Sequence, residues 1–230
     1  MIDLNTIINT VINEDALVIL KQLDDKCINL ICTDPPYGVR ENREEGKTWD
    51  NRDNFLQNID LWLNECFRVA NTVIWFCASS MLPYVLKNKE NNFHRLLIWN
   101  KPEGSQFAGA MHSNIWYSIE PILVFGKIPK TDKSKRYGYA SFTYRTIPEK
   151  MFGFPTTKPL GLMEDLIYFY SNEGDIICDP FCGTGSTLVA AKKLNRKYIG
   201  IEINKDLIPI INKRLNNTNI SSIISQQTLI

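Results

Sequence analysis

The sequence has few of the residues that bind metals or form disulfides. It contains two histidines and six cysteines, and no two cysteines form a Cys-x-x-Cys pair. The cysteines lie mostly in or beside apolar runs, which is typical of buried, reduced thiols rather than of zinc ligands or a disulfide framework. We therefore expect no metal site.

The sequence also lacks a long apolar run and a marked net charge. No stretch approaches the roughly 18 to 20 apolar residues that span a bilayer, and the start of the chain does not have the pattern of a signal peptide. We therefore expect an intracellular, cytoplasmic protein without a membrane partner. Its 230 residues, 44% of them apolar, are enough for one large domain, and the net charge of +1 neither favours nor excludes nucleic acid.

Apolar runs alternate with helical patterns along most of the chain. Runs without helical periodicity predict strands at 28–33, 72–77, 95–99, 115–125, 175–178 and 198–201. Apolar residues at helical spacing predict helices at 14–23, 53–70, 159–171, 186–194 and 205–216, and we expect Ala78-Ser79-Ser80 to open a short helix that runs to about Asn88. The runs 95–99 and 115–125 have no obvious helix between them, so we expect an antiparallel pair. The alternation predicts an α/β fold, a Rossmann-like, doubly wound and mostly parallel sheet with helices on both faces.

The stretch Asp34-Pro35-Pro36-Tyr37 directly follows the predicted strand 28–33. Two prolines end the pairing of a strand, and ligands in open α/β sheets bind at the carboxyl ends of the strands. Taken alone, the stretch could be an ordinary proline turn with a capping aspartate. The charged, glycine-containing segment 38–52 follows it, and we expect this segment to form a mobile loop over the same edge.

A glycine-containing turn, Asp179-Pro180-Phe181-Cys182-Gly183-Thr184-Gly185, joins a predicted strand to a predicted helix. The glycines let a ligand approach the backbone, and we expect Ser186 or Thr187 to cap the helix. Glu202 ends the next strand, where an acid accepts hydrogen bonds from ribose hydroxyls. The third glycine of the dinucleotide fingerprint is absent, and no Gly-Lys-Ser/Thr follows, which disfavours NAD and ATP. The alternatives are another adenosine-bearing ligand, or a plain tight turn with a solvated glutamate.

Together these two motifs resemble those of the amino-group DNA methyltransferases that use S-adenosylmethionine. Tyr198-Ile199-Gly200-Ile201-Glu202 also resembles this family's sequences. The stretch Phe154 to Pro159 resembles the motif that precedes the family's cofactor-binding half. Asn13-Glu14-Asp15 resembles the acidic motif that lies upstream of the family's catalytic motif. The catalytic motif precedes the cofactor motif and a basic segment lies between them, an order that resembles the β class of this family.

The resemblance implies a class I methyltransferase fold with circularly permuted motif order. The catalytic half of the domain would comprise residues 1–126, and an inserted basic and aromatic target-recognition segment residues 127–154. The cofactor-binding half would follow at 155–216, with a polar tail at 217–230.

The resemblance also implies roles for the first motif. The Asp34 carboxylate and the Pro35 carbonyl would each accept one hydrogen of the target amine, which aims the nitrogen lone pair at the methyl group. Pro35 and Pro36 give this stretch a fixed backbone without competing N–H groups. Tyr37 would stack on a base flipped out of the duplex.

The cofactor-binding residues follow from the same resemblance. Asp179, Phe181, Gly183 and Gly185 would contact the methionine and adenosine portions, with Ser186 at the start of the helix and Glu202 on the ribose. Asp15 would lie near the cofactor's adenine. Lys158 would lie near its carboxylate end, or be a plain surface lysine, since the chain has Thr156-Thr157 where the family often has Thr-Gln or Thr-Glu.

Basic residues are concentrated before the cofactor-binding half. Residues 126–158 contain eight basic and two acidic side chains, with aromatic residues between them. This pattern favours a surface that contacts DNA phosphates, although a solvated polar loop has a similar composition. The candidate DNA-binding residues are Lys133, Lys135, Arg136, Tyr137 and Arg145. Because the segment is small for a sequence-reading module, a homodimer or a short recognition sequence is consistent with it.

The leading hypothesis is a DNA N6-adenine methyltransferase with S-adenosylmethionine as cofactor and DNA as partner. Aspartate heads the catalytic motif, and in the family serine at that position goes more often with N4-cytosine. The alternatives are an N4-cytosine methyltransferase, an RNA methyltransferase and a catalytically silent nucleic-acid-binding module. A cognate restriction endonuclease is a further candidate partner.

Overall fold

The computed structural model describes residues 1–38, 52–105, 117–129, 138–148, 151–154 and 156–217, and the side chains of 103–105 and 117 are left out of the description. Its elements, in chain order, are α1 (Leu4–Ile7), β1 (Thr10–Ile12), α2 (Ala16–Leu20), β2 (Ile28–Thr33), α3 (Arg52–Val69), β3 (Ala70–Phe76), η1 (Ser79–Met81), α4 (Leu82–Leu86), β4 (Phe93–Ser105), β5 (Tyr117–Gly126), β6 (Ser141–Thr143), α5 (Leu160–Tyr170), β7 (Ile176–Asp179), α6 (Ser186–Lys193), β8 (Lys197–Ile201), η4 (Lys205–Leu207) and α7 (Ile208–Asn216).

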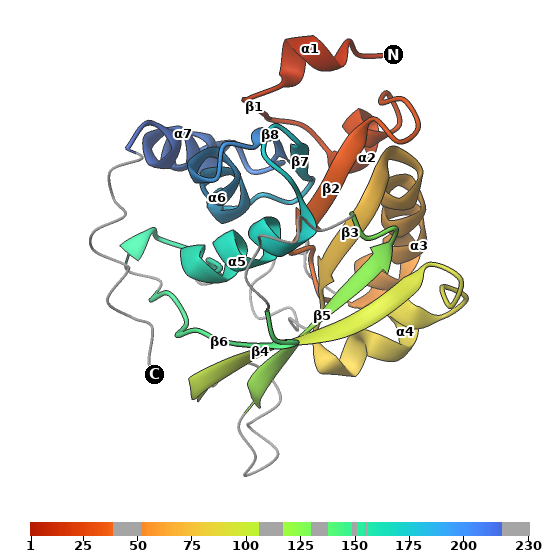
Figure 1. Ribbon diagram of the computed structural model, residues 1–230, viewed down its shortest axis with the longest axis vertical. Coiled ribbons are helices and arrows are strands. Elements are labelled where there is room, and N and C mark those ends of the chain that lie inside the picture. Colours follow the sequence, from red (N-terminus) through yellow and green to blue (C-terminus); the bar gives the residue numbers. More distant parts are fainter. Residues whose placement is uncertain (39–51, 106–116, 130–137, 149–150, 155, 218–230) are drawn as a thin grey trace.

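One sheet of eight described strands forms the middle layer, in the order β1-β8-β7-β2-β3-β5-β4-β6 (Figure 1). The first five strands in this order are mutually parallel, β5 is antiparallel to both β3 and β4, and β6 is parallel to β4. Among the described strands, β5 alone therefore runs in the reverse direction. Its amino-terminal half lies at the sheet edge where the parallel strands end.

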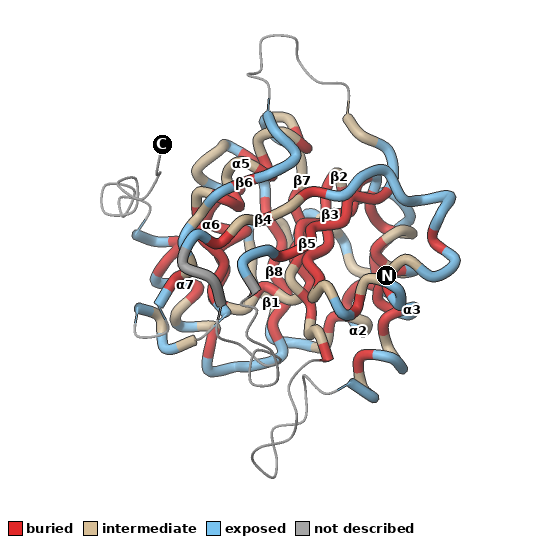
Figure 2. Tube along the Cα trace, turned by 90° about the horizontal axis from the view of Figure 1, so that it is seen from below, coloured by how far each residue is buried: buried red, intermediate tan, exposed pale blue. Residues whose placement is uncertain are grey.

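Two helical layers cover the sheet, with α5, α6 and α7 on one face and α2, α3 and α4 on the other (Figure 1). The central strands are buried on both sides. Successive residues of β2 contribute to opposite cores, with Leu30 and Cys32 facing the first helical layer and Ile31 facing the second. Figure 2 shows this buried centre running through the middle of the molecule beneath a more exposed periphery. Such two-sided burial explains why the central strands appear in the sequence as continuous apolar runs.

The predicted α/β alternation and the antiparallel pair are confirmed, because the run 95–99 and the described part of the run 115–125 lie in β4 and β5, which pair antiparallel. The sequence prediction missed α1, β1 and β6. Strand β1 pairs with β8, and β6, which lies inside the predicted inserted segment, pairs with β4. Each of these two strands has three residues, which is too short to show periodicity. Among the described helices, none is both long enough and apolar enough to cross a membrane.

Candidate active site

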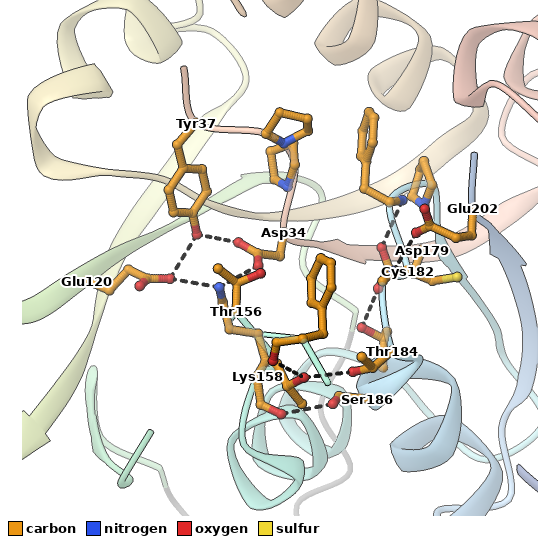
Figure 3. Close-up of a pocket in the computed structure, with 18 of the residues that line it drawn as sticks. Asp34, Tyr37, Glu120, Thr156, Lys158, Asp179, Cys182, Thr184, Ser186 and Glu202 are labelled. Atoms are coloured by element: carbon orange, nitrogen blue, oxygen red, sulfur yellow. Dashed lines mark hydrogen bonds and ion pairs between the residues drawn. The ribbon is translucent and has the colours of Figure 1, made fainter. Parts of the chain in front are cut away.

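A cavity of about 1010 Å³ lies where the parallel strands end. Most of the predicted site residues line it: Asp15, Asp34, Pro35, Pro36, Tyr37, Lys158, Asp179, Phe181, Gly183, Ser186 and Glu202. Figure 3 shows the residues around Asp34 on one side of this cavity and those around Asp179 and Glu202 on the other. The sheet thus brings together two motifs that are far apart in the sequence, because β2 and β7 are neighbours.

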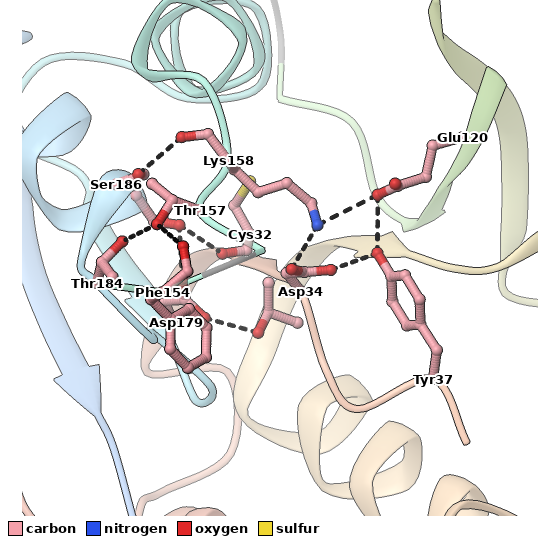
Figure 4. Close-up of polar contacts among 12 residues, drawn as sticks. Cys32, Asp34, Tyr37, Glu120, Phe154, Thr157, Lys158, Asp179, Thr184 and Ser186 are labelled. Atoms are coloured by element: carbon pink, nitrogen blue, oxygen red, sulfur yellow. Dashed lines mark hydrogen bonds and ion pairs between the residues drawn. The ribbon is translucent and has the colours of Figure 1, made fainter. Parts of the chain in front are cut away.

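Asp34 is the centre of a polar network at one side of the cavity (Figure 4). The Lys158 ammonium forms an ion pair with Asp34 Oδ2 and lies 3.2 Å from Glu120 Oε1. The Tyr37 hydroxyl contacts Asp34 Oδ1 and lies 2.8 Å from Glu120 Oε1. Lys101 Nζ donates to Glu120 Oε2 at 2.6 Å. Two carboxylates and two ammonium groups therefore share one small volume and balance in charge.

The two carboxyl groups of this network differ in acidity. Burial raises the pKa of Asp34 above its ordinary value, although the Lys158 ammonium opposes the shift. Burial acts on Glu120 in the same direction, but Lys158 and Lys101 together hold the pKa of Glu120 below its ordinary value. Burial and then the two carboxylates raise the pKa of Tyr37 well above its ordinary range, so its hydroxyl keeps its proton. Burial and the two ammonium groups thus shift the pKa values of the two carboxyl groups in opposite directions.

Asp179 ends β7 and is satisfied by neutral donors. Its Oδ1 accepts hydrogen bonds from the Thr33 hydroxyl at 2.7 Å and from the Phe181 backbone at 3.2 Å, and its Oδ2 accepts from the Thr187 hydroxyl at 2.5 Å. Burial raises the pKa of Asp179 to about 6, and these hydrogen bonds oppose the shift. The side chain fixes the turn that follows it, because it binds both strand β2 and helix α6.

Glu202 follows β8 and holds the glycine turn from the other side. Its Oε2 accepts from Gly183 N and its Oε1 accepts from Asn204 N, both at 2.8 Å. Burial raises the pKa of this carboxyl group. Each carboxylate oxygen has a second lone pair, so Glu202 retains acceptor capacity for hydroxyl groups in the cavity.

The glycine turn leaves space for a bound molecule. A Cβ added at Gly183, whose φ is +51°, would meet a single ring carbon of Phe154 at 3.9 Å, so the position is open where it faces the cavity. The Phe181 ring packs edge-on against Trp62 and Trp75, at centroid distances of 5.2 and 6.4 Å. An open glycine backbone, an acceptor carboxylate and an aromatic wall fit the adenosine part of S-adenosylmethionine.

The expectation that Ser186 or Thr187 caps α6 is wrong. The N-cap residue is Gly185, and no side chain caps the helix. The two hydroxyls are committed elsewhere, because Ser186 donates to the Lys158 carbonyl at 2.8 Å and Thr187 donates to Asp179. Gly185 itself has φ +82° and does not line the cavity, and a Cβ there would lie 2.8 Å from Ile211. Its place is explained by backbone conformation and packing.

Asp15 lines the cavity and also caps α2, since its Oδ1 accepts from the backbone of Leu17 and Val18. Lys158 is buried rather than a plain surface lysine.

Of the candidate DNA-binding residues, Lys133, Lys135, Arg136 and Tyr137 lie outside the described residues, as does nearly all of the predicted loop 38–52. Arg145 is described and exposed. The three residues after it, Thr146, Ile147 and Pro148, line the cavity.

Sequence reasoning missed Glu120 and Lys101. Glu120 lies on the long strand β5 and Lys101 on the long strand β4, and neither belongs to a recognisable motif. One signal was available, because Glu120 is the single charged side chain within the apolar run 115–125 and a charge in a buried strand needs a partner. Within the described part of the chain, no group of three or more His, Cys, Asp or Glu side chains is placed to hold a metal ion.

Residues 28–213 match the sequence model of a family described as DNA methylase. The chain belongs to this family. The type II methyltransferase M.HpaI of Haemophilus parainfluenzae is 32% identical to it, over 88% of this chain and 73% of M.HpaI. The DNA adenine methyltransferase YhdJ of Escherichia coli K12 is 26% identical, over 90% of this chain and 82% of YhdJ.

The crystal structure of M1.HpyAVI in complex with S-adenosylmethionine matches this DNA methylase with a TM-score of 0.66 and 26% identity. The match covers 90% of this chain and 98% of that one. The prediction of an enzyme with the class I methyltransferase fold, S-adenosylmethionine as cofactor and DNA as substrate is confirmed.

Proposed function

We propose that this DNA methylase methylates the exocyclic N6 of an adenine that is flipped out of a short DNA sequence. The observation that carries the proposal is the position of Asp34, whose carboxylate lies in the same cavity as Gly183 and Glu202. A base amine brought to Asp34 would lie beside the cofactor cradle, as direct transfer requires.

The amine of adenine is a poor nucleophile, because its lone pair is delocalised into the ring. When bound, S-adenosylmethionine supplies an electrophilic methyl group. The Asp34 carboxylate and the Pro35 carbonyl hold the two amine hydrogens and so aim the lone pair. Nitrogen must lose one of these protons on methylation, and Asp34 is the acceptor best suited to take it, since burial raises its pKa. Gly183 and Glu202, which line the cavity, would hold the adenosine, and Phe181 would provide an aromatic wall beside it.

Asp34 at the head of the motif favours adenine over cytosine. DNA methylated by the purified chain should be digested to nucleosides and analysed by mass spectrometry, and we expect N6-methyladenine. N4-methylcytosine alone would contradict the adenine proposal. Transfer of tritiated methyl groups to RNA but not to DNA would favour an RNA enzyme, and cofactor binding without any transfer would indicate a silent binding module.

Target recognition is proposed for residues 127–154, including Lys133, Lys135, Arg136, Tyr137 and Arg145. Support comes from the basic composition of this segment and from Thr146, Ile147 and Pro148, which line the cavity. Sequencing of DNA from cells that express the chain, by a method that reports methylated bases in context, would give the recognition sequence. A homodimer, a cognate restriction endonuclease and a cytoplasmic location remain predictions.

A further inference from the structure

Both carboxylate oxygens of Asp34 already have a partner within the protein. Its Oδ2 is paired with the Lys158 ammonium and its Oδ1 contacts the Tyr37 hydroxyl. A target amine that donates to this carboxylate must displace at least one of these groups. Both groups are buried or half-buried, so a displaced group needs another acceptor within reach.

Glu120 is placed to be that acceptor. Its Oε1 is 2.8 Å from the Tyr37 hydroxyl and 3.2 Å from Lys158 Nζ, so it contacts both groups that occupy Asp34. Its Oε2 is fixed by Lys101 Nζ at 2.6 Å. Glu120 belongs to β5, which pairs with strands on both sides and holds the carboxylate in place. Figure 4 shows Lys158 Nζ between the Asp34 and Glu120 carboxylates, with Tyr37 bridging the same pair.

We propose that Glu120 is a positioning residue, which takes over the Lys158 ammonium and the Tyr37 hydroxyl from Asp34 when the target amine enters. The proposal rests on the role of Asp34 in the proposed function. The exchange keeps the balance of charge, because Lys158 moves between two neighbouring carboxylates while the amine donates to Asp34. Without a charged Glu120, Lys158 would have Asp34 as its remaining carboxylate in the network, and the lysine would compete with the base.

The test compares DNA carrying adenine with DNA carrying purine, which lacks the amino group, at the methylated position. In the wild-type protein, with a non-reactive cofactor analogue bound, we expect several-fold tighter binding of the adenine duplex. In Glu120→Gln the adenine preference should fall towards one and kcat should fall about 10- to 100-fold, while the affinity for S-adenosylmethionine stays within about twofold. Circular dichroism and the cofactor titration report whether the variant is folded.

A second substitution separates competition by Lys158 from a merely structural defect. In Glu120→Gln/Lys158→Met the competing ammonium is gone, so the adenine preference should return at least in part. A further loss in the double variant would overturn the proposal, as would an unchanged preference in Glu120→Gln. If Glu120→Gln does not fold, Glu120→Asp is the alternative, because it keeps the charge but shortens the side chain by one methylene group. Glu120→Asp should show an intermediate loss of the adenine preference. An adenine preference equal to that of the wild-type protein would overturn the proposal. Wild-type protein that methylates no adenine would instead refute the proposed function.

Discussion

The two sides of the cavity hold their carboxylates by different means. At the side of Asp34, which we propose to be the catalytic side, Asp34 and Glu120 share the ammonium of Lys158 and the hydroxyl of Tyr37. At the opposite side, which we propose to be the cofactor side, Asp179 and Glu202 are bound by backbone N–H groups and threonine hydroxyls. The exposed fraction is 8% for both Glu120 and Glu202, so burial does not distinguish these two carboxylates.

The difference concerns what can move. A lysine has a flexible stem and a compact charge, so it can pass from one carboxylate to another. Backbone N–H groups cannot rearrange without unfolding a turn, and they bind the carboxylate with strong, charge-assisted hydrogen bonds. At the catalytic side the carboxylates can therefore exchange their hydrogen-bond partners, whereas at the cofactor side the backbone partners hold the carboxylates in one arrangement. Four substitutions test this contrast.

Replacement of Asp34 should have the largest effect. In Asp34→Ala the target amine loses its carboxylate acceptor, and we expect methyl transfer to fall by about 1000-fold or more. Lys158 keeps Glu120 as a partner, so the fold and the cofactor cradle should persist. Single-turnover transfer to DNA measures the first expectation and calorimetric titration with S-adenosylmethionine measures the second. A comparable loss of affinity for S-adenosylmethionine would contradict the proposal that Asp34 acts on the target amine rather than on the cofactor.

Glu202→Gln should affect the opposite side. The amide supplies one acceptor oxygen where the carboxylate supplies two, and both Gly183 N and Asn204 N need an acceptor. We expect the dissociation constant for S-adenosylmethionine to rise about 10- to 100-fold, which corresponds to about 1.4 to 2.7 kcal/mol. Affinity for DNA without cofactor should stay within a few-fold. Glu120→Gln is the matched control, because the same chemical change at the other side should leave cofactor binding nearly unchanged.

Gly185→Ala tests whether the glycine-containing turn from Asp179 to Gly185 is rigid. Gly185 and Gly174 have the same φ of +82°, but an added Cβ meets Ile211 at 2.8 Å at Gly185 and nothing within 4 Å at Gly174. Gly174→Ala should therefore cost only the left-handed backbone strain, about 1 to 2 kcal/mol, and Gly185→Ala about 1 to 3 kcal/mol more. Urea unfolding of both variants gives the difference. Equal free energies of unfolding for the two variants would show that α7, which contains Ile211, shifts to accommodate the added methyl group.

The same contrast explains how much of the site could be predicted from the sequence. Asp34, Asp179, Gly183 and Glu202 lie in short motifs directly after predicted strands, so local pattern and the parallel order of the sheet were enough to bring them together. Their partners come from distant, unremarkable positions. Lys158 is 124 residues from Asp34, and Lys101 and Glu120 meet because β4 and β5 pair in a particular register. Side-chain pairing across a sheet depends on that register, which the sequence pattern does not specify.

The smallest expected effect is the dependence of stability on Asp179. Its pKa of about 6 in the folded protein exceeds the ordinary value of 3.8, so the folded state binds this proton more tightly than the unfolded state. The resulting stabilisation is complete below the ordinary pKa and is lost as the pH rises through 6. Between pH 7.5 and pH 5.0 the wild-type protein should gain about 1 kcal/mol from this group. Asp179→Asn should lack this gain, and its amide can still meet Thr187, whose hydroxyl can accept as well as donate.

Urea unfolding of the wild-type protein and Asp179→Asn at both pH values isolates this contribution, because the other buried acids are common to the two proteins. Equal pH dependence would mean that Asp179 is ionised in the folded state at pH 5.0. Its hydroxyl and backbone donors would then stabilise the charge as fully as water does. The fixed cofactor side would in that case hold a carboxylate without a lysine and without the rise in pKa that burial otherwise causes.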